Sequence, residues 1–213
     1  MLNVYDDGNN EADKMTLPGH DNREWCGVKM RLQPGWVVLL GMTLTVFLLR
    51  LEGRIWWCAC GYLNLWDGDI WSAHNSQHVF DPYSFTHILH GVLLCWILTW
   101  VFSRMALSWR ITLAVLLEAV WEVLENSPFI IQRYREATIG QGYVGDSIIN
   151  SLADILCCAA GFLLARKLGF RLALLLFVAV ELALALMVRD NLCLNVLMLI
   201  CPIDAVKQWQ MVH

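Results

Sequence analysis

The chain has 213 residues, of which 58% are hydrophobic and only 16% are charged, and its formal net charge is −4. A soluble domain of this length needs more polar surface than such a composition supplies, so we exclude a soluble globular protein. The chain has no basic stripe, and we therefore expect no nucleic-acid partner. These features predict an integral membrane protein that contacts membrane lipids.

Residues 1–34 are polar and net acidic, and no charged segment in them leads into an apolar run as it does in a signal peptide. We expect these residues to form a polar cytoplasmic tail. Basic residues near the ends of the apolar runs are slightly more numerous on the side that the N-terminus shares, which favours an N-terminus inside the cell. The predicted location is the cell inner membrane, crossed several times.

Five apolar runs approach or reach the length of about 20 helical residues that crosses a hydrocarbon core of about 30 Å. They cover residues 36–50, 83–103, 109–125, 146–165 and 168–188. A sixth run at 192–203 is too short to span and is broken by Pro202, so we expect it to be interfacial or re-entrant. The predicted fold class is all-α, a polytopic transmembrane helix bundle of five helices, or of six if this last run also enters the membrane.

The transmembrane domain is predicted to cover residues 35–203, with a C-terminal tail at 204–213. An external loop at 51–82 carries two cysteines and two histidines. They are Cys58, Cys60, His74 and His78. Such a set could bind zinc, although one intervening residue is not the usual spacing of a zinc knuckle. A disulfide between the two cysteines would be strained, and bonding to other cysteines or free, lipid-facing thiols are the alternatives.

Ionisable and polar side chains occur inside the predicted spans, where lipid would exclude them. A pair of histidines begins the second span, three glutamates follow one face of the third, and three polar residues at four-residue spacing begin the fourth. They are His87 and His90, then Glu118, Glu122 and Glu125, then Asp146, Asn150 and Asp154. Because a charge at membrane depth is costly unless it faces partners, each is a candidate functional residue.

The helical rise places most of these side chains in two layers within the outer half of the membrane. The outer layer contains His87, Glu122 and Asn150, and the deeper layer contains His90, Glu118, Asp154 and Glu181. Spacings of three and four residues keep each set on one helical face, so we predict a single pocket. The alternative is that these groups only hold helices together by hydrogen bonds, and Glu181 by itself is interpreted as a packing partner.

Imidazole together with carboxylate is a ligand set for a divalent metal such as zinc, manganese or magnesium. The predicted metal ligands are His87, His90, Glu118, Glu122 and Asp154. The predicted catalytic residues are Glu122, His87, Asp146 and Arg135. In this hypothesis Glu122 is the general base, His87 transfers a proton, and Asp146 orients the others.

The connection at 126–145 begins with Pro128, which is expected to end the preceding helix. Asp146 is expected to cap or anchor the next span. Arg135, or its neighbour Arg133, could stand over the acidic pocket and hold a phosphate or carboxylate of an anionic substrate. Contact of both arginines with lipid headgroups is the alternative.

Three stretches, ENSPFIIQRYR, GYVGDSIINSLADILCCAAGF and HNSQHVFDPYSFTHILHG, resemble an uncharacterised family of proteobacterial multi-pass inner-membrane proteins that is defined only as a domain of unknown function. The resemblance covers most of the chain between Cys58 and Asn195, and it implies no particular activity.

More distantly, the chain resembles the VanZ-like membrane proteins. The matching positions are His87 or His90, Glu122, Arg133 or Arg135, Asp146, Asn150 and Gly161. That similarity implies association with the cell envelope, and one member of the group confers teicoplanin-type resistance. The present chain departs from the pattern by adding three carboxylates and the Cys/His loop.

No phosphate-binding loop, haem-attachment motif or serine-nucleophile motif is present. Three classes of function remain open. The first is a metal-assisted hydrolase or transferase that acts on a lipid-linked or anionic small-molecule substrate of the envelope. The second is a component that binds or transports an ion or small molecule, and the third is an envelope scaffold without catalysis.

Overall fold

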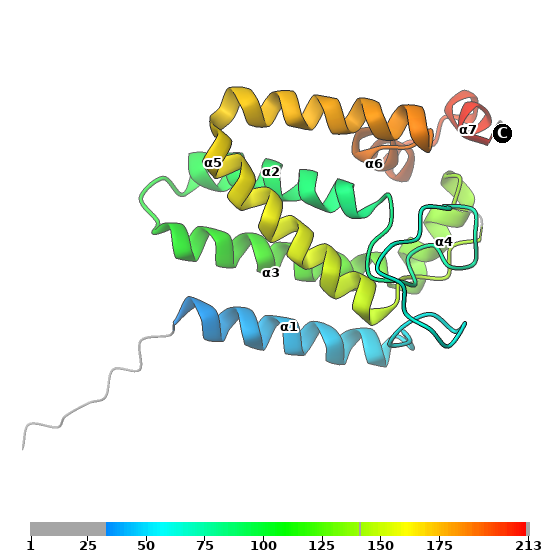
Figure 1. Ribbon diagram of the computed structural model, residues 1–213, viewed down its shortest axis with the longest axis horizontal. Helices are drawn as coiled ribbons and strands as arrows, with labels where there is room; N and C mark the ends of the chain where they lie inside the picture. The colour runs from blue at the N-terminus through cyan, green and yellow to red at the C-terminus, as the bar shows by residue number, and fades with distance from the viewer. Residues whose placement is uncertain (1–32, 141, 212–213) are drawn as a thin grey trace, which may run out of the picture. The chain divides into compact units, whose positions relative to one another are not determined.

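The computed structural model describes residues 33–140 and 142–211, and nearly all of their regular structure is helical (Figure 1). The helices are α1 (Pro34–Leu51), α2 (Ser84–Val101), α3 (Leu107–Glu125), α4 (Pro128–Ala137), α5 (Ile148–Met187), α6 (Leu192–Ile200) and α7 (Asp204–Met211). One isolated bridge joins Trp66 to Phe80 in the loop between α1 and α2. The all-α class is confirmed. The tail predicted at 1–34 lies, except for its last two residues, outside the described part of the chain.

The two predicted spans at 146–165 and 168–188 form one helix, α5, of 40 residues. Gly169 interrupts it with φ 73 and ψ 170, a conformation that glycine adopts without steric cost because it has no Cβ atom. Figure 1 shows the result as two limbs that meet at a sharp bend. At about 1.5 Å per residue, 40 residues measure about 60 Å, which is twice the thickness of a hydrocarbon core.

Among the described residues, three helices are long and apolar enough to cross a membrane, namely α1, α2 and α5. This finding supports a membrane protein but does not confirm the count of five spans. α3 has the length, with 19 residues, but it carries Arg110 and three glutamates. The run at 192–203 contains a helix of only 9 residues, α6, and a short non-helical segment at 201–203 separates it from α7.

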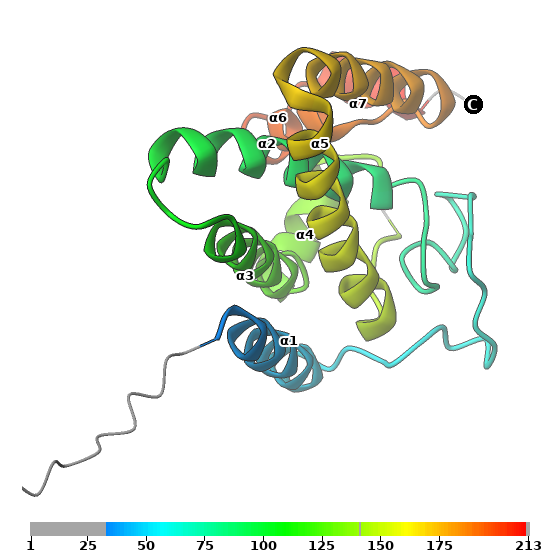
Figure 2. The same cartoon turned by 60° about the vertical axis from the view of Figure 1, so that its left-hand side comes forward.

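The helices alternate in direction. Figure 1 shows the C-terminal ends of α1 and α3 at the same end of the bundle as the N-terminal ends of α2 and α5. α2 packs most extensively against α5, and α1 packs against α3, as the turned view in Figure 2 also shows. The apolar core between α2, α3 and α5 consists of Val92, Cys95, Leu98, Ala114, Phe162, Ala165 and Ala173.

Two glycines set the distance between α2 and α5. A Cβ atom on Gly91 would collide with the backbone carbonyl of Cys158, and one on Gly161 would collide with the backbone carbonyl of Ile88. Because the obstacle is backbone in both cases, no side-chain rotation can relieve it. The two helices therefore approach as closely as their main chains allow, in the manner of small residues at membrane-helix interfaces.

The outer faces of the helices are apolar. Trp36 and Leu40 of α1 are 68% and 69% exposed, and Leu186 at the end of α5 is 85% exposed. Large aliphatic and aromatic side chains that point away from the protein along whole helices are unfavourable in water. This surface suits contact with lipid.

Two segments that the sequence predicts to be irregular are helical. Pro128 is predicted to end the preceding helix, and α3 does end before it, at Glu125. Pro128 also opens α4, because Ser127 accepts a hydrogen bond from the amide of Ile130 as its N-cap and proline fits the first helical turn. The predicted C-terminal tail contains α7, whose Gln210 donates a hydrogen bond of 3.1 Å to Asp190. Both short helices lie at the same end of the bundle as the start of α2 in Figure 1.

The close approach of α2 and α5 gives a testable expectation. Gly161→Val should destabilise the folded protein by at least about 1–3 kcal/mol, because overpacking here displaces backbone. Fluorescence-detected size exclusion in detergent, with a thermal ramp, measures the loss. Gly142→Ala is the control, since no atom lies within 4 Å of the added methyl group. Equal melting temperatures for the two variants would contradict this account of the interface.

Candidate functional site

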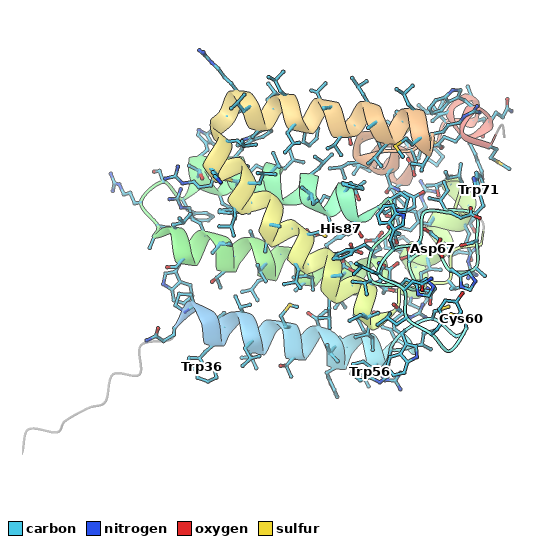
Figure 3. The ribbon with its side chains drawn as sticks, viewed as in Figure 1. Trp36, Trp56, Cys60, Asp67, Trp71 and His87 are labelled. Atoms are coloured by element: carbon cyan, nitrogen blue, oxygen red, sulfur yellow. The ribbon has the colours of Figure 1, made fainter. Side chains whose placement is uncertain are left out.

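A cavity lies at the end of the bundle where α2 and α5 begin. It is lined by the loop before α2 and by parts of α2 to α6, and about 70 Å³ of it is accessible to water. Figure 3 shows His87 within the bundle and Trp71 of the loop at the outer edge of this end. Its ionisable lining residues are Tyr83, His87, His90, Glu125, Tyr134, Tyr143, Asp146, Asp154 and Asp190.

Both histidines of α2 point at one carboxylate oxygen of α3. His87 Nδ1 lies 2.6 Å from Glu118 Oε1, and His90 Nδ1 lies 2.8 Å from the same oxygen. A three-residue spacing places the two imidazoles on one face of α2, and their rings meet edge to face with centroids 5.1 Å apart. Glu118 is 2% exposed, so it accepts both N–H groups in a site with almost no water.

His87 also faces two further carboxylates. Its Nδ1 lies 3.3 Å from Glu122 Oε1, and its Nε2 lies 3.9 Å from Asp154 Oδ2. When Glu118 accepts the Nδ1 proton, Nε2 keeps the lone pair and faces Asp154. His87, Glu122 and Asp154 can each present one ligand atom within 4.8 Å of the others.

Three carboxylates of α3 and of the residue before the N-cap of α5 form a second group. Glu122, Glu125 and Asp146 can also present ligand atoms within 4.8 Å of one another. The phenol of Tyr134 donates to Glu125 Oε1 at 2.8 Å, and the phenol of Tyr143 donates to Asp146 Oδ1 at 2.9 Å. Glu122 belongs to both groups and joins them.

Asp146 is not the N-cap of α5, although its position in the sequence suggests that role. The N-cap is Ser147, whose hydroxyl accepts from the amide of Asn150. The Asp146 carboxylate instead receives the side-chain amide of Asn126 at 2.9 Å, and the Asp146 amide donates to Asn126 Oδ1 at 2.7 Å. Burial raises the pKa of Asp146 to about 6, against the hydrogen bonds from Tyr143 and Asn126 that lower it.

Sequence reasoning missed several polar residues of the site. Asn126 is fully buried and binds Asp146, and Asp81 is 2% exposed and caps α2 by accepting the amides of Tyr83 and Ser84. Asn150 donates weakly to Asp81, at 3.5 Å. Neither Asn126 nor Asp81 belongs to a periodic pattern within a span. The Asp-Pro pair before α2, a common helix start, was the available signal for Asp81.

The predicted arginines do not reach the cavity. Arg135 donates to the backbone oxygen of Tyr143 at 2.5 Å, and Arg133 donates to the backbone oxygen of Leu199 at 2.8 Å. No lysine or arginine occurs among the described residues that line the cavity. Glu181 lies elsewhere too, where its two oxygens accept the amides of Leu192 and Cys193 at the start of α6.

Asp190 closes the cavity on the side of α6 and α7. Its oxygens accept hydrogen bonds from the side chains of Tyr83, Asn195 and Gln210 and from the amide of Asn191. All of these donors are neutral, and Asp190 is only 1% exposed. Burial therefore outweighs the hydrogen bonds and raises the pKa of Asp190 to about 6.

A family model described as "Protein of unknown function (DUF2585)" matches residues 49–212. A UPF0314 protein of Sinorhizobium fredii is 44% identical over 184 residues, which covers 84% of this chain and 93% of the relative. A UPF0314 protein of Sphingopyxis alaskensis is 44% identical, with 83% and 94% covered, and one of Novosphingobium aromaticivorans is 46% identical, with 80% and 88% covered. No solved structure matches the chain.

The raised pKa of Asp190 predicts a pH dependence of stability. The folded state holds this proton more tightly than the unfolded state, whose pKa is near the ordinary 3.8, so the contribution of Asp190 to stability is fully present below about pH 4 and is lost as the pH rises to about 6. The loss amounts to at most about 3 kcal/mol. Asp190→Asn should flatten part of this slope in thermal unfolding measured between pH 4 and 7, whereas Glu136→Gln, at an exposed carboxylate, should not. An unchanged slope in Asp190→Asn would contradict the assignment.

Proposed function

Because the chain belongs to the DUF2585 family, whose description assigns no activity, we propose its function from the site itself. We propose that it is a multi-pass inner-membrane protein that binds a divalent metal between His87, Glu122 and Asp154. We further propose that it hydrolyses or transfers a group on a lipid-linked substrate of the envelope.

One observation carries the proposal of a metal. Four carboxylate oxygens in the cluster are buried and accept no hydrogen bond. They are Glu122 Oε1 and Oε2, Glu125 Oε2 and Asp154 Oδ1. A buried carboxylate without hydrogen bonds or a counter-charge is strongly destabilising. His87 lies 3.3 Å from Glu122 and 3.9 Å from Asp154 and can offset one negative charge, and the lining residues provide no arginine or lysine. A divalent cation held by His87, Glu122 and Asp154 would supply the missing positive charge to these carboxylates.

The donor set fits such an ion. One imidazole nitrogen and two carboxylate oxygens resemble the three-ligand sites that zinc uses in catalysis, and manganese or magnesium would accept the same oxygens. Glu118 accepts the N–H groups of His87 and His90, and this hydrogen bonding orients an imidazole toward a metal. We therefore propose that Glu118 and His90, which the sequence suggested as ligands, orient His87.

The remaining groups suit proton transfer. A divalent metal activates a bound water as a nucleophile near neutral pH. Asp146, whose pKa burial raises to about 6, can take up or release a proton in the same range, and Glu122 links it to the metal ligands. Arg135 has no part in this proposal, because its guanidinium binds the backbone of Tyr143 outside the cavity.

The size of the cavity limits what enters it. Its 70 Å³ accessible to water holds about five water molecules, at roughly 10–15 Å³ for each. An ion with its waters and the reacting end of a substrate fit, whereas a whole lipid-linked molecule does not. The apolar outer faces of the helices offer a surface for the lipid portion, which supports a lipid-linked substrate.

We base the orientation on the basic residues near the helix ends. Arg104, Arg110, Arg166, Lys167 and Arg171 lie at the α2–α3 turn or near the bend of α5, at the end of the bundle opposite the cavity in Figure 1. With Lys29 and Arg31, which precede α1 in the sequence, they number seven, against six near the other helix ends, namely Arg50, Arg54, Arg133, Arg135, Arg189 and Lys207. Basic residues favour the cytoplasmic side, and the excess is one residue. We propose five spans, which are α1, α2, α3 and the two limbs of α5, with a cytoplasmic N-terminus and a cavity that opens to the outside.

The metal proposal predicts a defined loss of bound ion. Glu122→Gln should lose one equivalent of metal relative to the wild type, measured by elemental analysis of detergent-purified protein, whereas Glu136→Gln should lose none. Chelation should lower the melting temperature of the wild type more than that of Glu122→Gln. An ion present at 100 times its Kd stabilises the folded state by about 2.7 kcal/mol. Equal metal content and equal chelator response in the two variants would refute the site.

The same variants separate catalysis from simple binding. Purified protein is incubated with a lipid extract of proteobacterial inner membranes, and released water-soluble headgroups are measured by mass spectrometry. Release by the wild type and by Glu136→Gln, but not by folded Glu122→Gln, supports a hydrolase. Metal binding without any release would instead support an ion-binding component.

A further inference from the structure

We propose that Cys58, Cys60, His74 and His78 bind a zinc ion that fixes the loop between α1 and α2 over the cavity. This site is separate from the metal cluster in the bundle and does not depend on it. It includes thiolate ligands, which the cluster lacks, and its role is structural.

The four side chains already converge. Each can present one ligand atom within 4.8 Å of the other three. Cys58 Sγ lies 3.2 Å from His74 Nδ1. In a tetrahedral zinc site with Zn–S near 2.3 Å and Zn–N near 2.0–2.1 Å, the ligand atoms stand about 3.3–3.8 Å apart. The ligand atoms therefore need to move by about an ångström at most to surround an ion.

The backbone holds the ligands in this arrangement. The amide of Cys60 donates to Cys58 Sγ at 3.2 Å, a hydrogen bond that fixes the position of the sulfur. His74 and His78 are brought to one side by a tight turn, in which the amide of Gln77 donates to the His74 carbonyl at 3.0 Å. Within that turn Ser76 has φ 59, a left-handed conformation that costs a non-glycine residue energy and is concentrated at functional sites.

The two imidazoles are ordered rather than free. Tyr62 stacks on His78 with ring centroids 5.5 Å apart, and His74 stacks on His78 at the same separation. His78 is 1% exposed, and its Nε2 is buried without a hydrogen-bond partner, 4.0 Å from Asp67 Oδ2. Ligation through Nδ1 would replace the hydrogen bond from the Asn64 amide and leave the Nε2 proton directed at Asp67. A carboxylate behind a metal-bound histidine is a common arrangement in zinc sites.

The loop that carries this cluster forms part of the cavity wall. Ile70, Trp71, Asn75 and Ser76 line the cavity and lie in the sequence between the first and last ligand. Figure 3 shows Cys60, Asp67 and Trp71 at the same end of the molecule as His87. A zinc ion that joins residues 58 and 78 closes a loop of about 20 residues, which removes conformational entropy from the open chain. It thereby holds these lining residues in place.

The loop is also fastened to α5. The amide of Ser147 donates to the Ser76 carbonyl at 2.9 Å, and the side chain of Gln77 donates to the Gly145 carbonyl at 2.8 Å. Ser76 and Gln77 lie in the sequence between the zinc ligands His74 and His78, and Gly145 and Ser147 flank Asp146. The two hydrogen bonds therefore connect the zinc-binding turn to the backbone on both sides of Asp146. Zinc binding in the loop is thus positioned to stabilise the start of α5.

Cobalt substitution tests the site. Detergent-purified full-length protein, stripped of metal and loaded with Co²⁺, should show thiolate-to-cobalt charge-transfer absorption in the near ultraviolet and strong visible bands of tetrahedral Co²⁺. The Cys58→Ser and His78→Ala variants should lose the charge-transfer band, which only a thiolate ligand produces. Cys193→Ser, at an exposed cysteine outside the loop, and His87→Ala, in the bundle cluster, should keep the charge-transfer band. The absorption therefore reports on this site whether or not the bundle cluster binds metal.

Limited proteolysis provides the second readout. Adding Zn²⁺ should slow cleavage within residues 52–83 by at least about tenfold in the wild type and in Cys193→Ser, since zinc binds the closed loop. It should not slow cleavage in Cys58→Ser. Charge-transfer bands that persist in a Cys58→Ser, Cys60→Ser double variant would overturn the proposal. So would a disulfide between Cys58 and Cys60 found by mass spectrometry in protein purified without reductant.

Discussion

The burial of carboxyl groups at one end of an apolar bundle is the constraint on which the rest of the structure depends. Five of them form the cluster, and the two imidazoles of His87 and His90 are the only groups among the described residues lining the cavity that can carry positive charge. The carboxyl groups are Glu118, Glu122, Glu125, Asp146 and Asp154. Most other polar residues at this end are neutral donors, such as Tyr134, Tyr143 and Asn126, which satisfy some of the oxygens but leave four without partners.

The geometry of the cluster depends on the close contact of α2 and α5. Gly91 follows His90 directly, and Gly161 lies two helical turns beyond Asp154, so the positions at which the two main chains touch are adjacent to the functional side chains. A bulkier residue at either glycine would separate the helices and lengthen the 3.9 Å distance between His87 and Asp154. Packing and site are therefore set by the same contact.

The helical segments and several residues of the cluster can be predicted from the sequence because both follow periodic rules, although the predicted number of membrane spans is not confirmed. Spacing of three and four gives the face of a helix, and distance from the helix end gives the depth. Together these two rules place His87, the glutamates of α3 and Asp154 of α5 in one region, but they assign Glu118 and Asp154 to a deeper layer than His87, whereas His87 lies 2.6 Å from Glu118 and 3.9 Å from Asp154. Neither rule gives the contacts of connecting segments. The sequence therefore favours a place for Arg135 over the acidic pocket, whereas α4 directs it to the backbone of Tyr143.

The same limit explains what was missed. Asn126 lies just beyond the end of α3, and Asp81 lies just before α2. Helical periodicity and the distance from a helix end do not predict side-chain positions outside the helices. The sequence around Gly169 does not indicate that α5 is one kinked helix, because a kinked helix and two helices joined by a short turn have the same hydrophobic pattern. The sequence of the predicted C-terminal tail likewise does not indicate α7, which a buried hydrogen bond from Gln210 to Asp190 holds in place.

The loop and the bundle form one mechanical unit. Ser147 is the N-cap of α5 and at the same time binds the backbone of Ser76 and Gln77, so the first turn of α5 begins where the loop turn ends. Asp146 immediately precedes this cap, and Asn150 and Asp154 follow it at intervals of one helical turn. The loop turn is therefore connected to all three through covalent and hydrogen-bonded backbone, in addition to the packing of α2 against α5.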